Sequence, residues 1–376
     1  MRSLHLLSDW KWTGPAEPVV SLCSHLAAEG IEVRLAFRKA PADFKERTIE
    51  KEAAGRGVPA SDGLRLNRYF SIRDWLFDIS NIRAYCQRMR IDILHCHLTH
   101  DHALAAASLF GHRERPLLVR TDHKRDGLIL GFFMERLLGR TDGLVTYSTR
   151  IRDLDTARFS FPADRTMVLP PGVVPHAGPT KDLRNGLGLA GTDRVIGVIG
   201  RLKPDRGYDV ILKGFKRLRE RVDGVKLVIV GRSSQIEESI KKPIAALGIE
   251  KDVILAGYRV DDYFSMISTF DVFVMMRAGS DGTARALREV MAMGKPALVS
   301  DRGMLPELVE DGVDGFVAPD EHALAERMER LLTDGALRTR LGEAARRKAL
   351  EKWDYKAQAR RLIEFYESLS AKGKRR

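Results

Sequence analysis

The sequence lacks the features by which membrane-spanning, secreted and disulfide-rich proteins are recognised. No apolar run approaches the roughly 18 residues that a membrane-spanning helix needs, so we expect none. The first residues hold only a short apolar run and no small-residue cleavage site, so we expect no signal peptide. The three cysteines, Cys23, Cys86 and Cys96, form no CxxC pair, which predicts free thiols in a reducing cytosol.

Signatures of nucleic-acid and dinucleotide binding are also missing. The formal net charge is +12, but the basic residues are spread along the chain without an RNA-binding signature or a basic helix-turn-helix. We therefore expect no nucleic-acid partner, and we attribute the charge to attraction for phosphate-bearing small molecules or anionic lipids. Gly197 and Gly200 lie in the apolar segment 194–200 but do not complete GxGxxG, which argues against NAD.

Short apolar segments alternate with helical patterns twice along the chain. The first series of expected strands lies at 4–8, 31–37, 91–97, 116–122 and 143–148. The stretch 169–193 is rich in Pro and Gly and has no sustained periodicity, which is typical of an inter-domain linker. The second series lies at 194–200, 226–231, 252–257, 271–276 and 296–300. The pattern predicts an α/β protein with two parallel sheets, whose ligand binds at the carboxyl ends of the strands.

Two carboxylates mark the stretch "GSDGTARALREVMAMGKP". Asp281 precedes a helix that we expect to begin near Thr283, where Gly282 and the helix N-terminus would present backbone N–H groups to a phosphate. Simple capping of that helix by Asp281 is the alternative. Glu289 borders the apolar stripe of the same helix, so its carboxylate needs hydrogen-bond partners, either ribose hydroxyls or solvent.

Two arginines lie on a strand-to-helix loop of the same half of the chain. Arg201 and Arg206 follow the expected strand at 194–200, at the sheet edge where the acidic stretch also begins. Guanidinium groups bind phosphate oxygens through paired N–H donors. We therefore expect this loop to grip a diphosphate.

The segment "HCHLTHDH" at 95–102 has the composition of a metal site. His95 and His97 share one strand face, whereas His100 and His102 fall at the start of the next helix. Zinc needs convergent tetrahedral ligands, and the spacing matches no zinc signature. We expect a polar strand end at this place and no metal.

Several of these stretches together resemble a known family. "GRLKPDRG", "DGTARALREVMAMGKPALVSD" and "PELVEDGVDGFVAP" are similar in order and spacing to motifs of the retaining GT-B glycosyltransferases of family 4, whose E-x7-E motif corresponds to Asp281 and Glu289. The resemblance implies two Rossmann-like domains facing across a cleft. Residues 1–175 would bind the acceptor, with a C-terminal helix at 355–370 crossing back to them, and residues 190–352 would bind a nucleotide-sugar.

The resemblance also implies residue roles. The donor-binding residues would be Glu289 on the ribose, with Gly282, Thr283, Ala284 and Gly14 around the sugar and the diphosphate. The catalytic residues would be Asp281, Arg201, Arg206 and His123, and His97 would line the acceptor side. Five features depart from the family. Asp281 replaces Glu, Arg206 replaces Lys and Ala284 replaces Gly. Arg285 stands where an apolar residue is common, and "GRSS" at 231–234 stands where the family often has GDG or GSG.

The activity implied by the resemblance is metal-independent sugar transfer, with no cofactor, to a glycan or lipid-linked acceptor in lipopolysaccharide or other cell-envelope assembly. The location would be the cytoplasm or the inner face of the cytoplasmic membrane.

The segments 65–90 and 126–140 mix apolar residues with Arg, and are either core-packed amphipathic helices or a face that rests on an anionic bilayer. An epimerase or phosphorylase of the same fold, or a non-catalytic sugar-nucleotide-binding protein, is the alternative.

Overall fold

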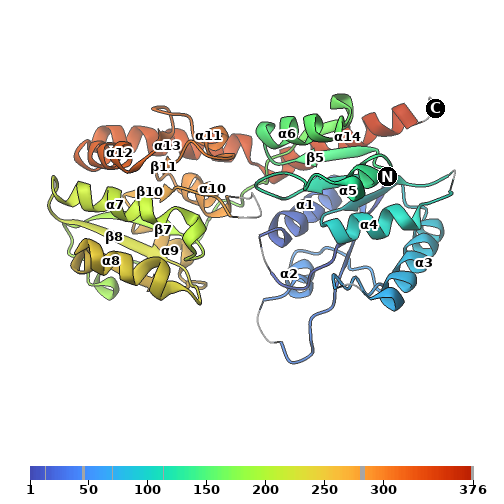
Figure 1. The fold of residues 1–376 in the computed structure, drawn as a ribbon, viewed down its shortest axis with the longest axis horizontal. Helices are drawn as coiled ribbons and strands as arrows, with labels where there is room; N and C mark the ends of the chain where they lie inside the picture. Colours follow the sequence, from blue (N-terminus) through green and yellow to red (C-terminus); the bar gives the residue numbers. More distant parts are fainter. Residues whose placement is uncertain (13, 45–46, 70, 113, 280–283, 374–376) are drawn as a thin grey trace. The chain divides into compact units, whose positions relative to one another are not determined.

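Two six-stranded parallel sheets organise the chain in the computed structural model, which describes residues 1–373 except 13, 45–46, 70, 113 and 280–283 (Figure 1). The first sheet belongs to a compact unit made of Met1–Gly172 and the segment from Asp354 onward. The second belongs to a unit made of the described residues from Val173 to Trp353. Over the described part of the chain, no helix combines the length and the apolar character that crossing a membrane requires.

The first sheet has the strand order β2-β1-β3-β4-β5-β6. Its strands are β1 (Arg2–Leu7), β2 (Glu32–Phe37), β3 (Ile93–Cys96), β4 (Leu117–Asp122), β5 (Gly143–Thr146) and β6 (Thr166–Val168). The central strands are buried on both faces, because helices cover both sides of a parallel sheet, and this explains their nearly continuous apolar sequences.

The helices of the first unit build two apolar layers against this sheet. They are α1 (Ala16–Ala28), α2 (Ile49–Gly55), α3 (Ile72–Met89), α4 (Thr99–Ser108), α5 (Phe132–Leu138), α6 (Thr149–Phe159) and α14 (Tyr355–Gly373). Side chains of α3, α4 and α5 share one core cluster with Leu4, Leu94 and Leu118. Side chains of α1, α2 and α14 share the other with Ile93 and Val119. The last helix of the chain therefore completes the first unit.

The second sheet has the order β12-β11-β10-β7-β8-β9. Its strands are β7 (Arg194–Ile199), β8 (Val225–Val230), β9 (Val253–Gly257), β10 (Val272–Met275), β11 (Ala297–Val299) and β12 (Gly315–Val317). Its helices are α7 (Tyr208–Arg219), α8 (Lys242–Leu247), α9 (Tyr263–Ser268), α10 (Arg285–Ala292), α11 (Leu305–Leu308), α12 (Glu321–Thr333) and α13 (Gly335–Lys352). The two central strands β7 and β10 pair directly, so the loops that follow them leave the same edge side by side.

The α/β class and the two parallel sheets predicted from the sequence are confirmed. Every expected strand is present, with ends that differ by a few residues from those predicted. The outer strands β6 and β12 were not predicted, because each is only three residues long and carries no extended apolar pattern.

Candidate functional site

The loop after β7 lies against the segment after β10 in the second unit. Arg206 ends a short 3-10 turn, Pro204–Arg206, and its Nη1 donates a hydrogen bond to the carbonyl of Ala278 at 2.6 Å. Gly207 then starts α7 with a φ of +75°, and a Cβ there would stand 2.8 Å from Met276 Cβ. Glycine at 207 thus lets the arginine loop approach the end of β10 closely.

The two arginines of this loop differ in their surroundings. The Arg206 side chain is only 11% exposed, and its Nε stands 3.6 Å from Asp205 Oδ1. Arg201 is exposed, and its guanidinium has no hydrogen-bond or ion-pair partner among the described residues. Arg201 is thus a cation open to a ligand, whereas Arg206 both carries charge and holds the loop. Their role on a diphosphate stays a prediction.

The acidic stretch is only partly described. Asp281, Gly282 and Thr283 lie outside the described residues, so their predicted contacts with sugar and diphosphate stay predictions. Helix α10 begins at Arg285, later than the start near Thr283 expected from the sequence. The reason lies in Ala284, whose φ of +42° is left-handed and therefore not helical.

Ala284 occupies a strained backbone conformation. An L-residue with a side chain loses about 1–2 kcal/mol in the left-handed region, which glycine enters freely. Ala284 is buried, with 3% of its surface exposed. The position is the one at which the family resemblance leads us to expect glycine, so the backbone here keeps a shape that glycine would adopt without strain.

Glu289 is a buried carboxylate with protein partners on both oxygens. The residue is 8% exposed, Oε1 accepts from Arg285 Nε at 2.7 Å, and Oε2 accepts from Tyr263 Oη at 2.6 Å. Burial, and then the charge of Glu289, hold the pKa of the Tyr263 hydroxyl well above its usual value, so this hydroxyl remains a donor. Each carboxylate oxygen accepts more than one hydrogen bond. The predicted bond from Glu289 to ribose thus stays a prediction, with a carboxylate already oriented by the protein.

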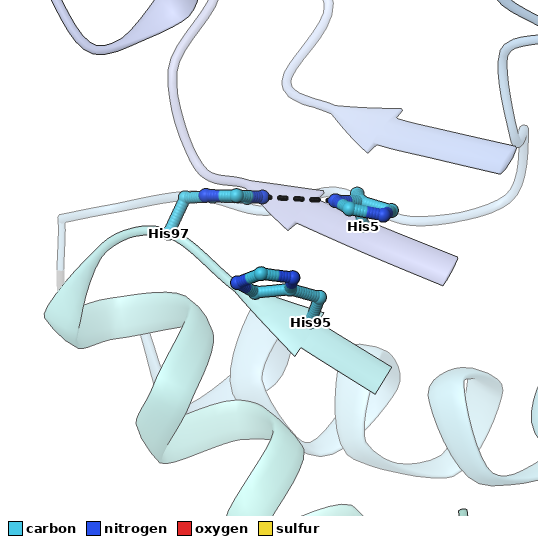
Figure 2. Close-up of side chains that lie close together, drawn as sticks. All are labelled: His5, His95 and His97. Carbon is cyan, nitrogen blue, oxygen red and sulfur yellow. Dashed lines mark hydrogen bonds between the residues drawn. The ribbon is translucent and has the colours of Figure 1, made fainter. Parts of the chain in front are cut away.

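A hydrogen-bonded row of imidazoles crosses the first sheet toward its carboxyl edge. His5 Nδ1 lies 3.0 Å from His97 Nε2, as Figure 2 shows, and His97 Nδ1 lies 3.1 Å from His123 Nε2. His123 Nδ1 lies 2.7 Å from the Tyr147 hydroxyl. The row exists because β1 and β3 are parallel neighbours with His5 opposite His95, and His97 lies on the same face two residues later.

The imidazoles of this row are neutral at pH 7. Burial lowers the pKa of His5 to about 3, and burial is also the largest cause that holds the pKa values of His97 and His123 well below the usual range. A neutral imidazole has one N–H donor and one acceptor nitrogen, so all hydrogen bonds of the row run in one direction. Both ring nitrogens of His123 form hydrogen bonds within the protein, to His97 and to Tyr147. Its predicted approach to the transferred sugar stays a prediction.

The histidine-rich segment 95–102 does not converge on one point. His102, on α4, bonds through Nε2 to Thr141 Oγ1 and so points away from His95 and His97. The residue that lies close to His95 and His97 is His5, and one ring nitrogen from each of these three histidines lies within 4.8 Å of the others. The rings of His95 and His97 are stacked, with centroids 4.6 Å apart and planes 18° from parallel (Figure 2). Since a metal lies in the plane of each imidazole that binds it, stacked rings favour a hydrogen-bonded layer over a metal centre.

The C-terminal helix closes this layer. His95 Nδ1 lies 2.5 Å from Tyr366 Oη of α14, and His95 Nε2 lies 2.6 Å from Thr121 Oγ1. Next to it a cavity of about 20 Å³, lined in part by His97, Thr121 and Tyr147, has room for a water molecule.

Gly14 lies in the turn before α1, and its predicted place under the donor stays a prediction.

Sequence reasoning missed His5, Tyr147, Tyr263 and Tyr366. A histidine inside the apolar segment "LHLLS" was the only local signal for His5. The other three are aromatic residues whose partners are at least 24 positions away, so no periodicity reveals them.

Two sequence families match the chain. Residues 179–348 match the family described as Glycosyl transferases group 1, and residues 13–176 match Glycosyltransferase Family 4. The two matches cover most of both units and meet close to the boundary between them.

Three curated relatives illustrate the range of the family. Spore coat protein SA of Bacillus subtilis is 27% identical over 60% of this chain and 64% of its own. A GDP-mannose-dependent alpha-(1-6)-phosphatidylinositol monomannoside mannosyltransferase of Mycolicibacterium smegmatis is 29% identical over 61% of this chain and 63% of its own. A lipopolysaccharide 1,2-N-acetylglucosaminetransferase of Salmonella typhimurium is 28% identical over 54% of this chain and 56% of its own. The matched segment thus spans less than two thirds of each relative.

Solved structures share the fold over nearly the whole chain. A glycosyltransferase from Rickettsia africae aligns with a TM-score of 0.82 at 15% identity, over 98% of both chains. The Anabaena protein HepE, in complex with UDP and glucose, aligns with a TM-score of 0.77 at 19% identity, over 98% of this chain and 100% of its own. With both units matched in sequence and the whole in architecture, the chain belongs to the group 1, family 4 glycosyltransferases and has the GT-B fold.

Proposed function

We propose that the protein is a retaining glycosyltransferase that moves a sugar from a nucleotide-sugar to a glycan or lipid-linked acceptor, in lipopolysaccharide or other cell-envelope polysaccharide assembly. The observation that carries the donor part is the bond from Arg206 to Ala278, because it joins the arginine loop to the segment that leads into the acidic stretch. The relatives support sugar transfer, since one is named for a mannosyl donor and another for N-acetylglucosamine transfer to lipopolysaccharide.

Charge development explains why arginines belong at this edge. When the bond between the sugar carbon and the diphosphate oxygen breaks, negative charge grows on the diphosphate and positive character on the sugar. Arg206 is held in place by Ala278 and is therefore preorganised, whereas Arg201 is exposed and free to reach the leaving diphosphate. Such preorganised donors are usually the largest contribution to catalysis.

In this proposal the sugar retains its anomeric configuration because the substitution takes place on one face of the sugar. The acceptor oxygen forms its bond to the sugar carbon on the face that the diphosphate leaves, and the departing phosphate oxygen takes the acceptor proton. Two-step retention through a covalent intermediate needs two carboxylates roughly 5 Å apart. Both carboxylate oxygens of Glu289 accept hydrogen bonds, from Arg285 and from Tyr263, which makes Glu289 a poor nucleophile and supports the single-step route.

The proposed reaction uses no metal. Two guanidinium groups and backbone N–H donors supply the positive charge that a divalent cation supplies in metal-assisted phosphate chemistry. Dialysis against a chelator should therefore leave turnover unchanged, and loss of turnover that Mg²⁺ or Mn²⁺ restores would overturn this part of the proposal.

A donor screen tests the function. UDP-, GDP-, ADP- and CMP-sugars are compared by thermal shift, because a bound ligand raises the apparent stability by mass action. The nucleotide-sugar that stabilises the protein is then followed for release of nucleoside diphosphate with a glycan acceptor, and the product anomer is determined by NMR. We expect the donor's anomeric configuration in the product. Turnover without any glycan acceptor would favour an epimerase or phosphorylase, and binding without turnover a non-catalytic protein.

A further inference from the structure

Four large apolar side chains are exposed within five residues of the first unit. Ile129, Leu130, Phe132 and Phe133 have exposed fractions of 69%, 58%, 78% and 56%. We call residues 129–133 the apolar tip. Single exposed apolar residues are ordinary, but clustered ones on a protein surface usually mark an interaction site.

The backbone that leads into the apolar tip is firmly held. Leu128 is fully buried, and its N–H donates to Asp155 Oδ1 of α6 at 2.9 Å. Arg158 Nη1, one turn further along α6, donates to the carbonyls of Asp126 at 3.2 Å and Leu128 at 3.1 Å. Gly127 has a φ of +77°, and a Cβ there would stand 2.7 Å from Asp155 Oδ1. The residues that precede the apolar tip are thus held in place by hydrogen bonds to α6.

A second apolar row lies on α3 in the same layer of helices. Ile72 and Leu76, one turn apart, are each 65% exposed, and the neighbouring Phe77 is 38% exposed. Helix α3 packs on α4, and α4 packs on α5, whose first two residues are the last two of the apolar tip (Figure 1). Arg140, just after α5, lies over the ring of Phe110 at the end of α4, 4.4 Å from its centroid. This layer covers the sheet face opposite the histidine row.

The two segments that carry these side chains also account for half of the net positive charge. Residues 65–90 contain six Arg against two Asp, and residues 124–140 contain one Lys and three Arg against one Asp and one Glu. Their excesses of four and two positive charges make up half of the formal net charge of +12. Apolar side chains among basic ones match a surface with an anionic face over an apolar interior.

We propose that the apolar tip and the α3 row dock on an anionic phospholipid bilayer, with Phe132 and Phe133 in the acyl region and the arginines at the headgroup phosphates. This deepens the proposed function by naming the surface at which a lipid-linked acceptor is met. A protein interface would also bury the aromatic residues, but its centre is depleted of charge, and these segments are rich in it. The observations therefore favour the bilayer.

Vesicle sedimentation with purified protein tests the proposal. Neutral phosphatidylcholine vesicles are compared with vesicles that contain phosphatidylglycerol, using the parent, the double variant Phe132→Asp/Phe133→Asp and the control Val260→Asp/Val313→Asp. Val260 and Val313 are each 45% exposed in the second unit, so the control places the same two charges on an unrelated surface. We expect the parent and the control to bind the anionic vesicles, and the double variant to bind at least tenfold more weakly.

Binding of the double variant equal to that of the parent would overturn the proposal. So would a parent that stays in solution with all vesicles, a result that would point to a protein partner. The changed side chains are exposed, so the melting temperature should not move; if it does, Phe132→Trp replaces the double variant. Its added fluorescence should shift to the blue with anionic vesicles, and no shift would contradict insertion. Thermal shift by nucleotides, measured on the same double variant, should match the parent, which separates failure of docking from failure of donor binding.

Discussion

At the carboxyl edge of the second sheet Arg201 and Arg206 carry guanidinium groups and Arg201 is open to solvent, whereas the histidine row toward the same edge of the first sheet is neutral and buried. Glu289 and Arg206 are held by hydrogen bonds within the second unit, and Arg201 faces solvent. In the first unit His5 bonds to His97, and His97 bonds to His123. The comparison suggests that the second unit binds charge, whereas the histidine row gives the first unit a neutral, hydrogen-bonded layer.

The largest effect is expected at the arginines. Arg206→Ala removes a donor aimed at the leaving diphosphate, so turnover should fall on the order of 10²-fold or more. Arg206→Lys should be milder, since the charge remains. Initial rates are compared with those of Arg221→Ala, an arginine of the same unit that is 46% exposed and pairs with Glu329. Full activity in both Arg201→Ala and Arg206→Ala would remove the arginines from the donor site.

A smaller effect is expected at Asp281, which lies outside the described residues. Asp281→Asn keeps the capacity to cap a helix, because Asn caps about as well as Asp, but removes the charge. If Asp281 contacts the sugar, the rate should drop at least tenfold, or about 1.4 kcal/mol in the barrier, at unchanged melting temperature. Equal rate and equal stability would leave Asp281 as a helix cap only.

The neutral row predicts a loss of stability in acid. The pKa of His5 falls from 6.5 to about 3 on folding, so the unfolded chain binds more protons between these values, and stability declines as pH falls through that window. His95, His97, His102 and His123 act in the same direction. Burial raises the pKa of Asp101 to about 6 and of Asp155 to about 7, which acts oppositely, but these carboxyls are fewer.

Replacing one histidine isolates this contribution. His5→Phe should reduce the slope of unfolding free energy against pH between about 4 and 6 by about 1.4 kcal/mol per pH unit, one proton's worth. Denaturant unfolding at several pH values measures the slope, and His322→Phe, at an exposed position on α12, should leave it unchanged. A slope unaltered in His5→Phe would mean that His5 is not neutral in the folded protein.

The smallest effect is expected at Ala284. Ala284→Gly relieves a left-handed backbone but gives up a buried methyl and adds chain entropy to the unfolded state, so we expect a gain between zero and about 1 kcal/mol. The matched change Ala286→Gly, inside α10, should cost about 1 kcal/mol. Chemical denaturation compares them, and a destabilised Ala284→Gly would show that the methyl contact outweighs the strain.

The difference between the two edges also explains what the sequence could predict. Buried parallel strands are nearly continuous apolar segments, so both sheets were predicted with every strand except the short outer strands β6 and β12. The charged candidates Arg201, Arg206 and Glu289 were found because they follow or border such segments. His5 was missed, since its place beside His95 depends on β1 and β3 being neighbours 90 positions apart. Tyr263 was missed because it reaches Glu289 from a different helix.

Nucleotide binding measured by calorimetry, with Glu289→Ala beside Tyr147→Phe, tests most directly whether the second unit holds the donor. Glu289→Ala should weaken binding of the matching nucleoside diphosphate by about 1–3 kcal/mol, the range of hydrogen bonds to charged groups. Tyr147→Phe removes only a hydroxyl at the end of the histidine row and should leave the affinity unchanged. Undiminished nucleotide affinity in Glu289→Ala, or loss of affinity confined to Tyr147→Phe, would contradict the division between a charged donor edge and a neutral histidine row.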